Sequence, residues 1–273
     1  MSTVSRETRR VLVTGAAGGI GRLLREGLAG RYPVLRLSDR APLGRLRQGE
    51  EHAVAELEDL DQVVQASTGC DAVVHLGGIP EEAPWDQILR SNLIGAYNVF
   101  EAARINRVRR VVFASSNHVV GFYRRKQQVG THEPMRPDSR YGWSKACGEM
   151  LARLYADKYA VESVCLRIGS FRPEPLDPRM LSTWISASDT VQLVACALEA
   201  KDVHHEVVYG VSNNDRGWWR NPAAARIGFV PRSNAEAFAP KFANVAAQGD
   251  VGELFHGGSF CAQEFAGNED VIR

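Results

Sequence analysis

The chain has 273 residues, and 44% of them are hydrophobic, which is enough for a sizeable core. Its 33 basic side chains nearly balance its 32 acidic ones, so we do not expect a nucleic acid or another polyanion as partner, because such binders carry a basic excess. The sequence shows neither an apolar stretch near the ~20 residues of a membrane span nor an N-terminal signal peptide, which predicts a cytoplasmic protein with no membrane partner.

Short apolar runs and helical patterns alternate along most of the chain. The runs predict strands at residues 10–14, 34–37, 72–76, 110–114, 163–168 and 206–209. The helical patterns cover residues 18–29, 57–67, 88–105, 140–159 and 191–200. Strands that alternate with helices in this way form a parallel sheet with helices on both faces. The predicted fold class is therefore α/β, a Rossmann-type doubly wound parallel sheet.

A glycine-rich turn, Thr14-Gly15-Ala16-Ala17-Gly18-Gly19-Ile20-Gly21, joins the first predicted strand to the first predicted helix. Gly15 permits the tight turn, Gly18 allows a pyrophosphate to approach the backbone, and Gly21 permits close packing of helix on strand. The helix N-terminus also offers unpaired amides and a positive dipole to phosphate. This context favours dinucleotide binding over an ordinary glycine-rich turn. The expected contacts are Gly15, Gly18, Gly19, Ile20 and Gly21.

Acidic residues after the next strands bear on the choice of cofactor. Asp39 ends the second strand, near the ~20-residue offset of the acid that binds the ribose hydroxyls. A carboxylate there repels a 2′-phosphate, so we expect NAD and not NADP. Arg40, which could favour NADP, is interpreted as a solvated turn residue. Glu56 and Leu57 could approach the adenine, although a helix-capping role explains Glu56 nearly as well.

Tyr141 and Lys145 are four residues apart on the predicted helix 140–159, so their side chains share one face. A phenol titrates near pKa ~10, too high for a base at neutral pH, and a neighbouring cation lowers that pKa. The pair therefore predicts a general base. Ser116 and Asn117 end a predicted parallel strand, where ligands bind in open α/β sheets. On position alone, a polar turn explains them equally well, and the Tyr–Lys pair favours the functional interpretation.

Together, the motifs Thr14-Gly-x-x-Gly-x-x-Gly21 and Tyr141-x-x-x-Lys145 resemble those of the extended short-chain dehydrogenase/reductases. The resemblance covers nearly the whole chain and is most specific at residues 74–79, 113–118, 167–170, 179–184 and 214–219. It points to those members that oxidise the C1 hemiacetal of D-glucuronate or D-galacturonate with NAD. Their product is an aldarolactone, which opens to the aldarate.

The resemblance also implies roles for single residues. Tyr141 would be the base, Lys145 would lower its pKa and hold the nicotinamide ribose, and Ser116 would hydrogen-bond the reacting oxygen. Asn117 and His118 would contact sugar hydroxyls. The resemblance further places four residues at the cofactor: Leu76, Gly77, Gly78 and Asn92.

The substrate carboxylate is assigned to the loop after the strand 163–168. The resemblance implies that Ser170 and Arg179 hold the carboxylate and nearby oxygens, and an arginine fork suits a carboxylate chemically. Arg172 is the competing clamp. Where relatives carry a serine that touches the sugar, this chain has Pro80, which offers no side-chain or amide donor. That sugar contact is therefore in question.

The helix–strand rhythm weakens after residue 170. Prolines break up residues 171–180, and the chain from Arg216 on is rich in Trp, Asn and Gly. We therefore divide the chain into an NAD-binding Rossmann domain at residues 1–170 and a small substrate-binding, lid-like portion at residues 171–273. A helix and a strand of the second portion are expected to return to the main sheet.

Other polar and aromatic residues are assigned packing or surface roles. His75 lies inside an apolar strand and is interpreted as a core histidine, and the tryptophans near the C-terminus are interpreted as packing residues. The arginines of residues 104–110 and 124–126 are interpreted as solvated faces. The five cysteines form no CxxC pair or zinc spacing, and His204-His205 lacks partners at ligand spacing, so no metal site is expected.

Two other functions share these motifs. A nucleotide-sugar epimerase or dehydratase has the same glycine turn and Tyr–Lys pair, but it needs a larger C-terminal domain to hold the nucleoside diphosphate. A non-catalytic NAD-binding sensor would not need Ser116, Tyr141 and Lys145 intact. The expected partner is thus a small sugar acid. By analogy with related dimers, which pair through the helices 88–105 and 140–159, a homo-oligomer is also expected.

Overall fold

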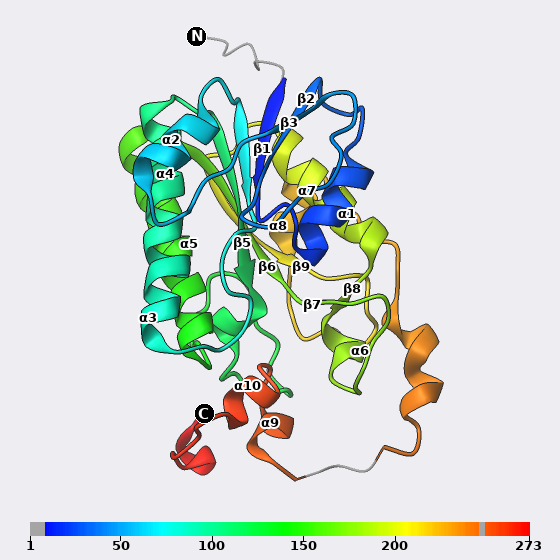
Figure 1. Ribbon diagram of the computed structural model, residues 1–273. Coiled ribbons are helices and arrows are strands. Elements are labelled where there is room, and N and C mark those ends of the chain that lie inside the picture. Colours follow the sequence, from blue (N-terminus) through cyan, green and yellow to red (C-terminus); the bar gives the residue numbers. More distant parts are fainter. Residues whose placement is uncertain (1–8, 246–248) are drawn as a thin grey trace.

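The structure is a computed structural model that describes residues 9–245 and 249–273. Seven parallel strands form its main sheet, in the order β3-β2-β1-β4-β5-β6-β9 (Figure 1). Their bounds are Arg10–Thr14 (β1), Val34–Ser38 (β2), Glu50–His52 (β3), Ala72–His75 (β4), Arg110–Ser116 (β5), Glu162–Ile168 (β6) and His205–Gly210 (β9). The α/β doubly wound fold is thereby confirmed.

The strands are parallel because each connection crosses the sheet through a helix or loop, and they are apolar because helices cover both faces. Every residue of β4 and β5 is buried. In the middle of the sheet, Val13 pairs with Leu37 on one side and with Val74 on the other. The strand order therefore reverses between β1 and β4. Ligands of open α/β sheets bind at the carboxyl ends of the strands at such a point.

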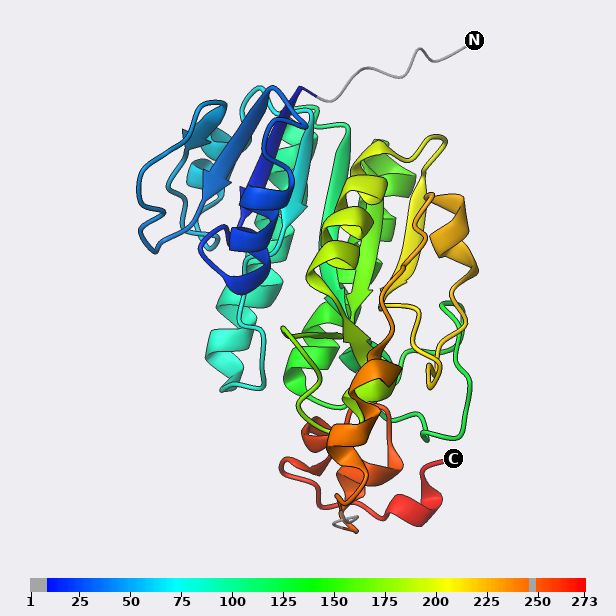
Figure 2. The same ribbon diagram turned by 90° about the vertical axis from the view of Figure 1, so that its right-hand side faces the viewer.

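Two helix layers enclose the sheet (Figures 1 and 2). α1 (Gly19–Gly27) and α7 (Ala187–Glu199) cover one face, and their side chains share a core cluster that includes Leu24, Leu193 and Val13. α2 (Leu60–Ser67), α4 (Gly95–Ile105) and α5 (Arg140–Tyr159) cover the other face, where Phe100 and Tyr155 lie in a second cluster. Helix α2 begins three residues later than predicted, because Asp59 caps it by accepting a hydrogen bond from Gln62 N.

The helix predicted at residues 88–105 is longer and less regular in the structure. It begins with α3 (Trp85–Ile88), continues through the π-helical segment η1 (Leu89–Ile94) and ends with α4. A π-helical turn inserts an extra residue and is frequent at functional sites. Here it carries Asn92, whose side chain turns inward and is buried.

Short elements, among them α6 (Met180–Thr183), α9 (Val251–Leu254) and α10 (Ser259–Ala262), lie beneath the carboxyl ends of the strands (Figure 1). β9 pairs with β6 in the main sheet, and α7 contacts α1 in the helix layer on one face of that sheet. The remaining elements are also short: η2 (Asn117–Val120), β7 (Ser170–Phe171), β8 (Trp184–Ile185), α8 (Pro222–Arg226), η3 (Ala235–Phe242) and η4 (Glu269–Val271). β7 and β8 form a separate two-stranded sheet.

Several arginines expected on solvated faces are instead structural. Arg124 donates to Ile272 O and Glu269 O at 2.9 and 2.5 Å, and Arg125 donates to Gly252 O and Phe255 O at 2.8 and 3.2 Å. The prediction is wrong for both because the short C-terminal helices leave backbone carbonyls that need donors. Lys126, the next residue in the chain, is exposed as expected.

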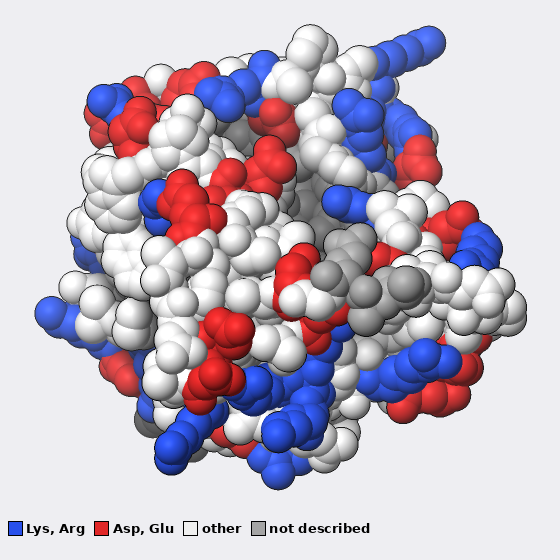
Figure 3. All heavy atoms as spheres, turned by 90° about the horizontal axis from the view of Figure 1, so that it is seen from below, with Lys and Arg blue, Asp and Glu red and all other residues white. Residues whose placement is uncertain are grey.

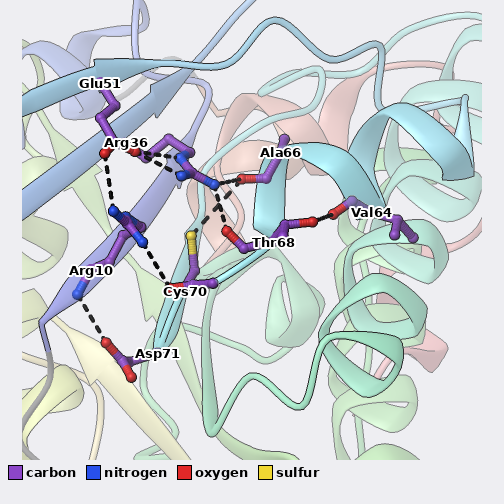
Figure 4. A network of polar contacts seen from close by, with 9 residues as sticks. Arg10, Arg36, Glu51, Val64, Ala66, Thr68, Cys70 and Asp71 are labelled. Atoms are coloured by element: carbon purple, nitrogen blue, oxygen red, sulfur yellow. Dashed lines mark hydrogen bonds and ion pairs between the residues drawn. The ribbon is translucent and has the colours of Figure 1, made fainter.

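Arginine side chains also donate hydrogen bonds to the carbonyl groups at the C-termini of α7 and α2. Arg110 is 1% exposed, contrary to its predicted place on a solvated face, and it donates to Ala197 O, Leu198 O and Ala200 O near the end of α7. Arg36 donates to Ala66 O and Thr68 O at the end of α2 and pairs with Glu51 (Figure 4). A guanidinium satisfies several terminal carbonyls and complements the negative end of the helix dipole.

Candidate active site

A cavity of about 1380 Å³ opens at the carboxyl ends of the strands, around the point where their order reverses. On this face of the molecule, seen from below, acidic and basic side chains are interspersed (Figure 3). All the predicted site residues line the cavity except Asn92. The structure therefore brings the glycine turn, the Tyr–Lys pair and the predicted substrate residues into one space.

The glycine turn is closely packed and leaves no room for side chains at two positions. Gly15 has a φ of +68°, and a Cβ atom there would lie 2.8 Å from Gly77 N. A Cβ atom at Gly21 would lie 2.3 Å from Gly15 O. The backbone can thus approach a ligand at the N-terminus of α1, whose first amides have no partner inside the helix. This cradle fits the pyrophosphate of a dinucleotide.

Asp39 is fixed at the edge of the cavity by two backbone amides. Its Oδ2 accepts from Ala17 N and its Oδ1 from Ala41 N, both at 2.9 Å. Each oxygen keeps a lone pair, so the carboxylate can also accept from ribose hydroxyls. The exposed Arg40 side chain lies 3.9 Å from Glu56, which agrees with its assignment as a turn residue. Glu56 lines the cavity but does not cap α2; the capping alternative is wrong, since Asp59 does so.

Asn92 does not line the cavity but holds Ile79, which does. Its side chain accepts from Ile79 N at 2.8 Å, and donates to Ile79 O and Ser144 Oγ at 3.1 Å. A Cβ atom at Gly78 would lie 2.8 Å from Asn92 Oδ1. Asn92 therefore holds the backbone after β4 against α5, which differs from the direct cofactor contact that was expected.

The reactive pair lies in the first two turns of α5, where one adjacent and one distant side chain accept hydrogen bonds from the first backbone amides of the helix. Ser139 accepts from Gly142 N at 3.0 Å, and Glu82 accepts from Tyr141 N at 2.9 Å. The Tyr141 hydroxyl is hydrogen-bonded to Ser116 at the end of β5. Lys145 Nζ lies 5.7 Å from the centroid of the Tyr141 ring. All three side chains are buried, so their electrostatic interactions are little screened.

The pKa of Tyr141 does not follow the predicted direction. Burial raises this pKa to about 12, whereas the hydrogen bond from Ser116 lowers it and the nearby Asp138 raises it. Burial also lowers the pKa of Lys145 to about 8, because a low-dielectric surrounding disfavours the ammonium form. Desolvation is the largest influence on the Tyr141 pKa, and Lys145 does not lower this pKa as the sequence predicted. Ser116 is the member of the trio that favours the phenolate.

The predicted substrate residues Asn117, Ser170 and Arg179 line the same cavity as Tyr141. With the amide of Asn117 oriented by its partners, its oxygen accepts from Arg179 Nη2 at 2.9 Å and its nitrogen donates to Ile168 O at 3.1 Å. Arg179 Nε donates to His256 O at 2.7 Å, and burial lowers the pKa of this guanidinium. The Ser170 hydroxyl lies 2.8 Å from Thr183 Oγ1.

Sequence reasoning missed residues that reach the cavity from distant segments. Phe260 lines the cavity and its ring stacks at 3.9 Å on that of His118, whose Nδ1 lies 2.6 Å from Oδ2 of the buried Asp138. Arg125 also lines the cavity. No local spacing connects these residues, and the only signal was their residue type.

His75 and Trp219 have the packing roles that the sequence predicted for them. His75 is buried, its Nδ1 lies 2.7 Å from Thr14 Oγ1, and burial lowers its pKa to about 3. Trp219 stacks on Tyr209 at 5.0 Å, away from the cavity lining. Among the described residues, no group of three or more His, Cys, Asp or Glu side chains could hold a metal ion, and no helix has the length and apolar character to cross a membrane.

Comparisons with known proteins agree with this geometry. A family model described as the NAD dependent epimerase/dehydratase family matches residues 11–190. The uronate dehydrogenase of Pseudomonas syringae pv. tomato is 44% identical, covering 93% of each chain, and that of Agrobacterium fabrum is 46% identical over 92% of this chain and 96% of its own. The chain belongs to this family, and within it to the uronate dehydrogenases. The resemblance inferred from the motifs is thereby confirmed.

Solved structures extend the likeness to the whole fold. A crystal structure of a mutant uronate dehydrogenase from Agrobacterium tumefaciens, complexed with NAD, has a TM-score of 0.89 and 44% identity, and covers 93% of this chain and 97% of that chain. The family is NAD dependent, which agrees with the cofactor that Asp39 predicts.

Proposed function

We propose that the protein oxidises the C1 hemiacetal of D-glucuronate or D-galacturonate with NAD and yields the aldarolactone. One observation carries the proposal: a single cavity is lined by the glycine turn, by Asp39, by Arg179 and by the trio Ser116, Tyr141 and Lys145. The identity of 44–46% to uronate dehydrogenases supports the choice of a sugar acid as substrate.

The residues that would hold NAD fit it by their backbone and charge. The amides at the N-terminus of α1 would bind the pyrophosphate, Asp39 would accept from the adenosine ribose hydroxyls, and Lys145 would hold the nicotinamide ribose. When bound, NAD accepts the hydride from C1. The negative charge of Asp39 disfavours a 2′-phosphate at the same place.

On the substrate side, Tyr141 would take the C1 hydroxyl proton while Ser116 hydrogen-bonds the same oxygen. Arg179 would bind the carboxylate at the opposite end of the sugar. Its Nε and one Nη2 hydrogen are already used by His256 O and Asn117, so Nη1 and the second Nη2 hydrogen remain. These hydrogens suit a carboxylate, because a guanidinium presents them in a fixed plane. Arg172 is exposed and bonds Phe171 O, which makes it the weaker clamp.

The test is turnover of glucuronate and galacturonate with NAD, followed by NADH absorbance. Tyr141→Phe should lower kcat by about 10³-fold or more, since it removes the base, and should leave NAD affinity within about twofold. Neutral aldoses and UDP-sugars serve as the comparison panel. Turnover of UDP-sugars but neither uronate would reject the proposal and favour the nucleotide-sugar alternative. NAD binding without turnover of any sugar would favour the sensor.

We further propose that the protein works as a homo-oligomer in the cytoplasm. Large apolar side chains are exposed on the two neighbouring helices α4 and α5, with Tyr97 at 48%, Met150 at 57% and Leu154 at 49%. Covering such side chains with a second copy removes apolar surface from water. The five cysteines are free thiols, which suits a reducing compartment.

A further inference from the structure

The imidazole of His118 is held on two sides at the cavity wall. Its Nδ1 lies 2.6 Å from Asp138 Oδ2, and its ring stacks on Phe260 at a centroid distance of 3.9 Å. The ring also meets that of Tyr141 nearly edge-on, at 5.8 Å. The orientation of His118 is therefore set by a carboxylate and two aromatic rings.

The Asp138 carboxylate is completely enclosed, with 0% of its side chain exposed. A Cβ atom added at Gly121 would lie 1.8 Å from Asp138 Oδ2, and one at Gly257 would lie 1.9 Å from the same oxygen. Two distant segments thus pack directly on this carboxylate, and only glycine fits at either place. A buried carboxylate needs donors to offset its lost hydration. Ser139 donates to Oδ1 at 2.7 Å, and His118 is the partner of Oδ2.

This arrangement determines which nitrogen of His118 carries the proton. Because the ionised carboxylate only accepts, the hydrogen between the two groups belongs to Nδ1. Within residues 9–245 and 249–273, Nε2 of His118 has no hydrogen-bond partner. The residue lines the cavity, so Nε2 is the polar atom that it offers there. In the neutral ring, Nε2 accepts from a hydroxyl.

We propose that Asp138 is a positioning residue: it holds His118 in the tautomer with a proton on Nδ1, so that Nε2 accepts a hydrogen bond from a sugar hydroxyl. The inference rests on the proposed oxidation of a sugar acid. Asp138 does not line the cavity and acts through His118. Gly257, which packs on Asp138, and Phe260, which packs on His118, lie in one short segment. The C-terminal part of the chain therefore supports both members of the pair.

A second Asp–His pair provides a matched control. His204 Nε2 lies 2.7 Å from Asp157 Oδ1, nearly the separation found between His118 and Asp138. Its side chains are 59% and 48% exposed, and neither residue lines the cavity. Asp157→Asn therefore makes the same chemical change at a site where we expect no effect on sugar binding or turnover.

The first test compares Asp138→Asn with the wild type and with Asp157→Asn. The amide can donate to Nδ1, which moves the imidazole proton to Nε2. We expect the ¹⁵N chemical shifts of His118 to report protonated Nδ1 in the wild type and protonated Nε2 in Asp138→Asn. The kcat/KM for glucuronate should fall about 10- to 100-fold, mainly through KM, as for a lost hydrogen bond to the substrate. NAD affinity should not change, and Asp157→Asn should match the wild type in all respects.

The second test is a double-mutant cycle with His118→Asn. The asparagine amide nitrogen can take the place of Nδ1 beside Asp138, but asparagine has no atom at the position of Nε2. In this background Asp138→Asn should have almost no further effect on kcat/KM, because both changes remove one contact. Additive losses, or an unchanged tautomer in Asp138→Asn, would overturn the inference. If the wild type turned over no uronate, the proposed function would fail instead, and the tautomer measurement would still test whether Asp138 holds His118.

Discussion

At Tyr141, burial and hydrogen bonding act on the phenol in opposite directions. Burial raises the pKa to about 12, and the hydrogen bond from Ser116 lowers it. Lys145 sits in the same buried space, where burial lowers its own pKa to about 8. The protein thus keeps the phenol protonated near neutral pH, and Ser116 is the neighbouring side chain that favours proton loss.

Replacing Ser116 should therefore move the pH dependence of the oxidation. The oxidation needs ionised Tyr141, so kcat/KM rises with pH until the phenol is deprotonated. Ser116→Ala removes the hydrogen bond that favours the phenolate, which raises the pKa and moves the rising limb to higher pH by about one unit or more. The measurement is kcat/KM for glucuronate across pH. Ser170→Ala, which removes a hydroxyl bonded to Thr183, should leave the limb in place. A limb that moves equally in both variants would contradict this role of Ser116.

Among the elements, the C-terminal helices depend on donors from elsewhere in the fold. α9 and α10 have four residues each, too few to satisfy their own backbone groups. Arg125 supplies two donors to Gly252 O and Phe255 O and lies over the Trp218 ring at 5.5 Å. The segment that carries Phe260 is therefore attached to the loop after η2 by side-chain hydrogen bonds.

Arg125→Gln should loosen this segment while leaving the main sheet intact. The change leaves buried carbonyls without their donor, which costs about 1–3 kcal/mol of the free energy of unfolding. We expect amide hydrogen exchange in residues 250–262 to be faster than in the wild type, and exchange in β5 to be unchanged. The KM for the sugar should also be higher than in the wild type. The neighbouring exposed Lys126 provides the control, since Lys126→Gln removes a charge without a carbonyl contact. Equal exchange rates in the two variants would show that Arg125 does not hold the segment.

For the molecule as a whole, the proposed subunit contact lies on the helix layer formed by α4 and α5 (Figure 1). The wild type should have at least twice the 30.0 kDa mass of one chain in light scattering. Met150→Glu should shift it towards the monomer, because a buried unpaired charge opposes association. Val230→Glu is the control, since Val230 is 64% exposed on another part of the chain. A monomeric wild type would reject the proposed oligomer.

Much of the fold could be predicted because it depends on local patterns. The helix at residues 140–159 and most strands were placed within one or two residues of their observed bounds, since apolar periodicity reports which faces are buried. The strand β3 was missed, because Glu50–His52 has three residues and no apolar run. Arg110 was misplaced because a buried arginine that caps a helix has the same local pattern as a solvated one.

The sequence by itself determined the fold class, the glycine turn, the acid at Asp39 and the helical spacing of Tyr141 and Lys145. These features depend on residues close together in the chain, whose geometry follows from helix and strand periods. Only the tertiary structure decided the direction of the Tyr141 pKa, the pairing of His118 with Asp138 and the stacking of Phe260. Desolvation and contacts between distant segments arise only when the chain is folded, so no local pattern contains them.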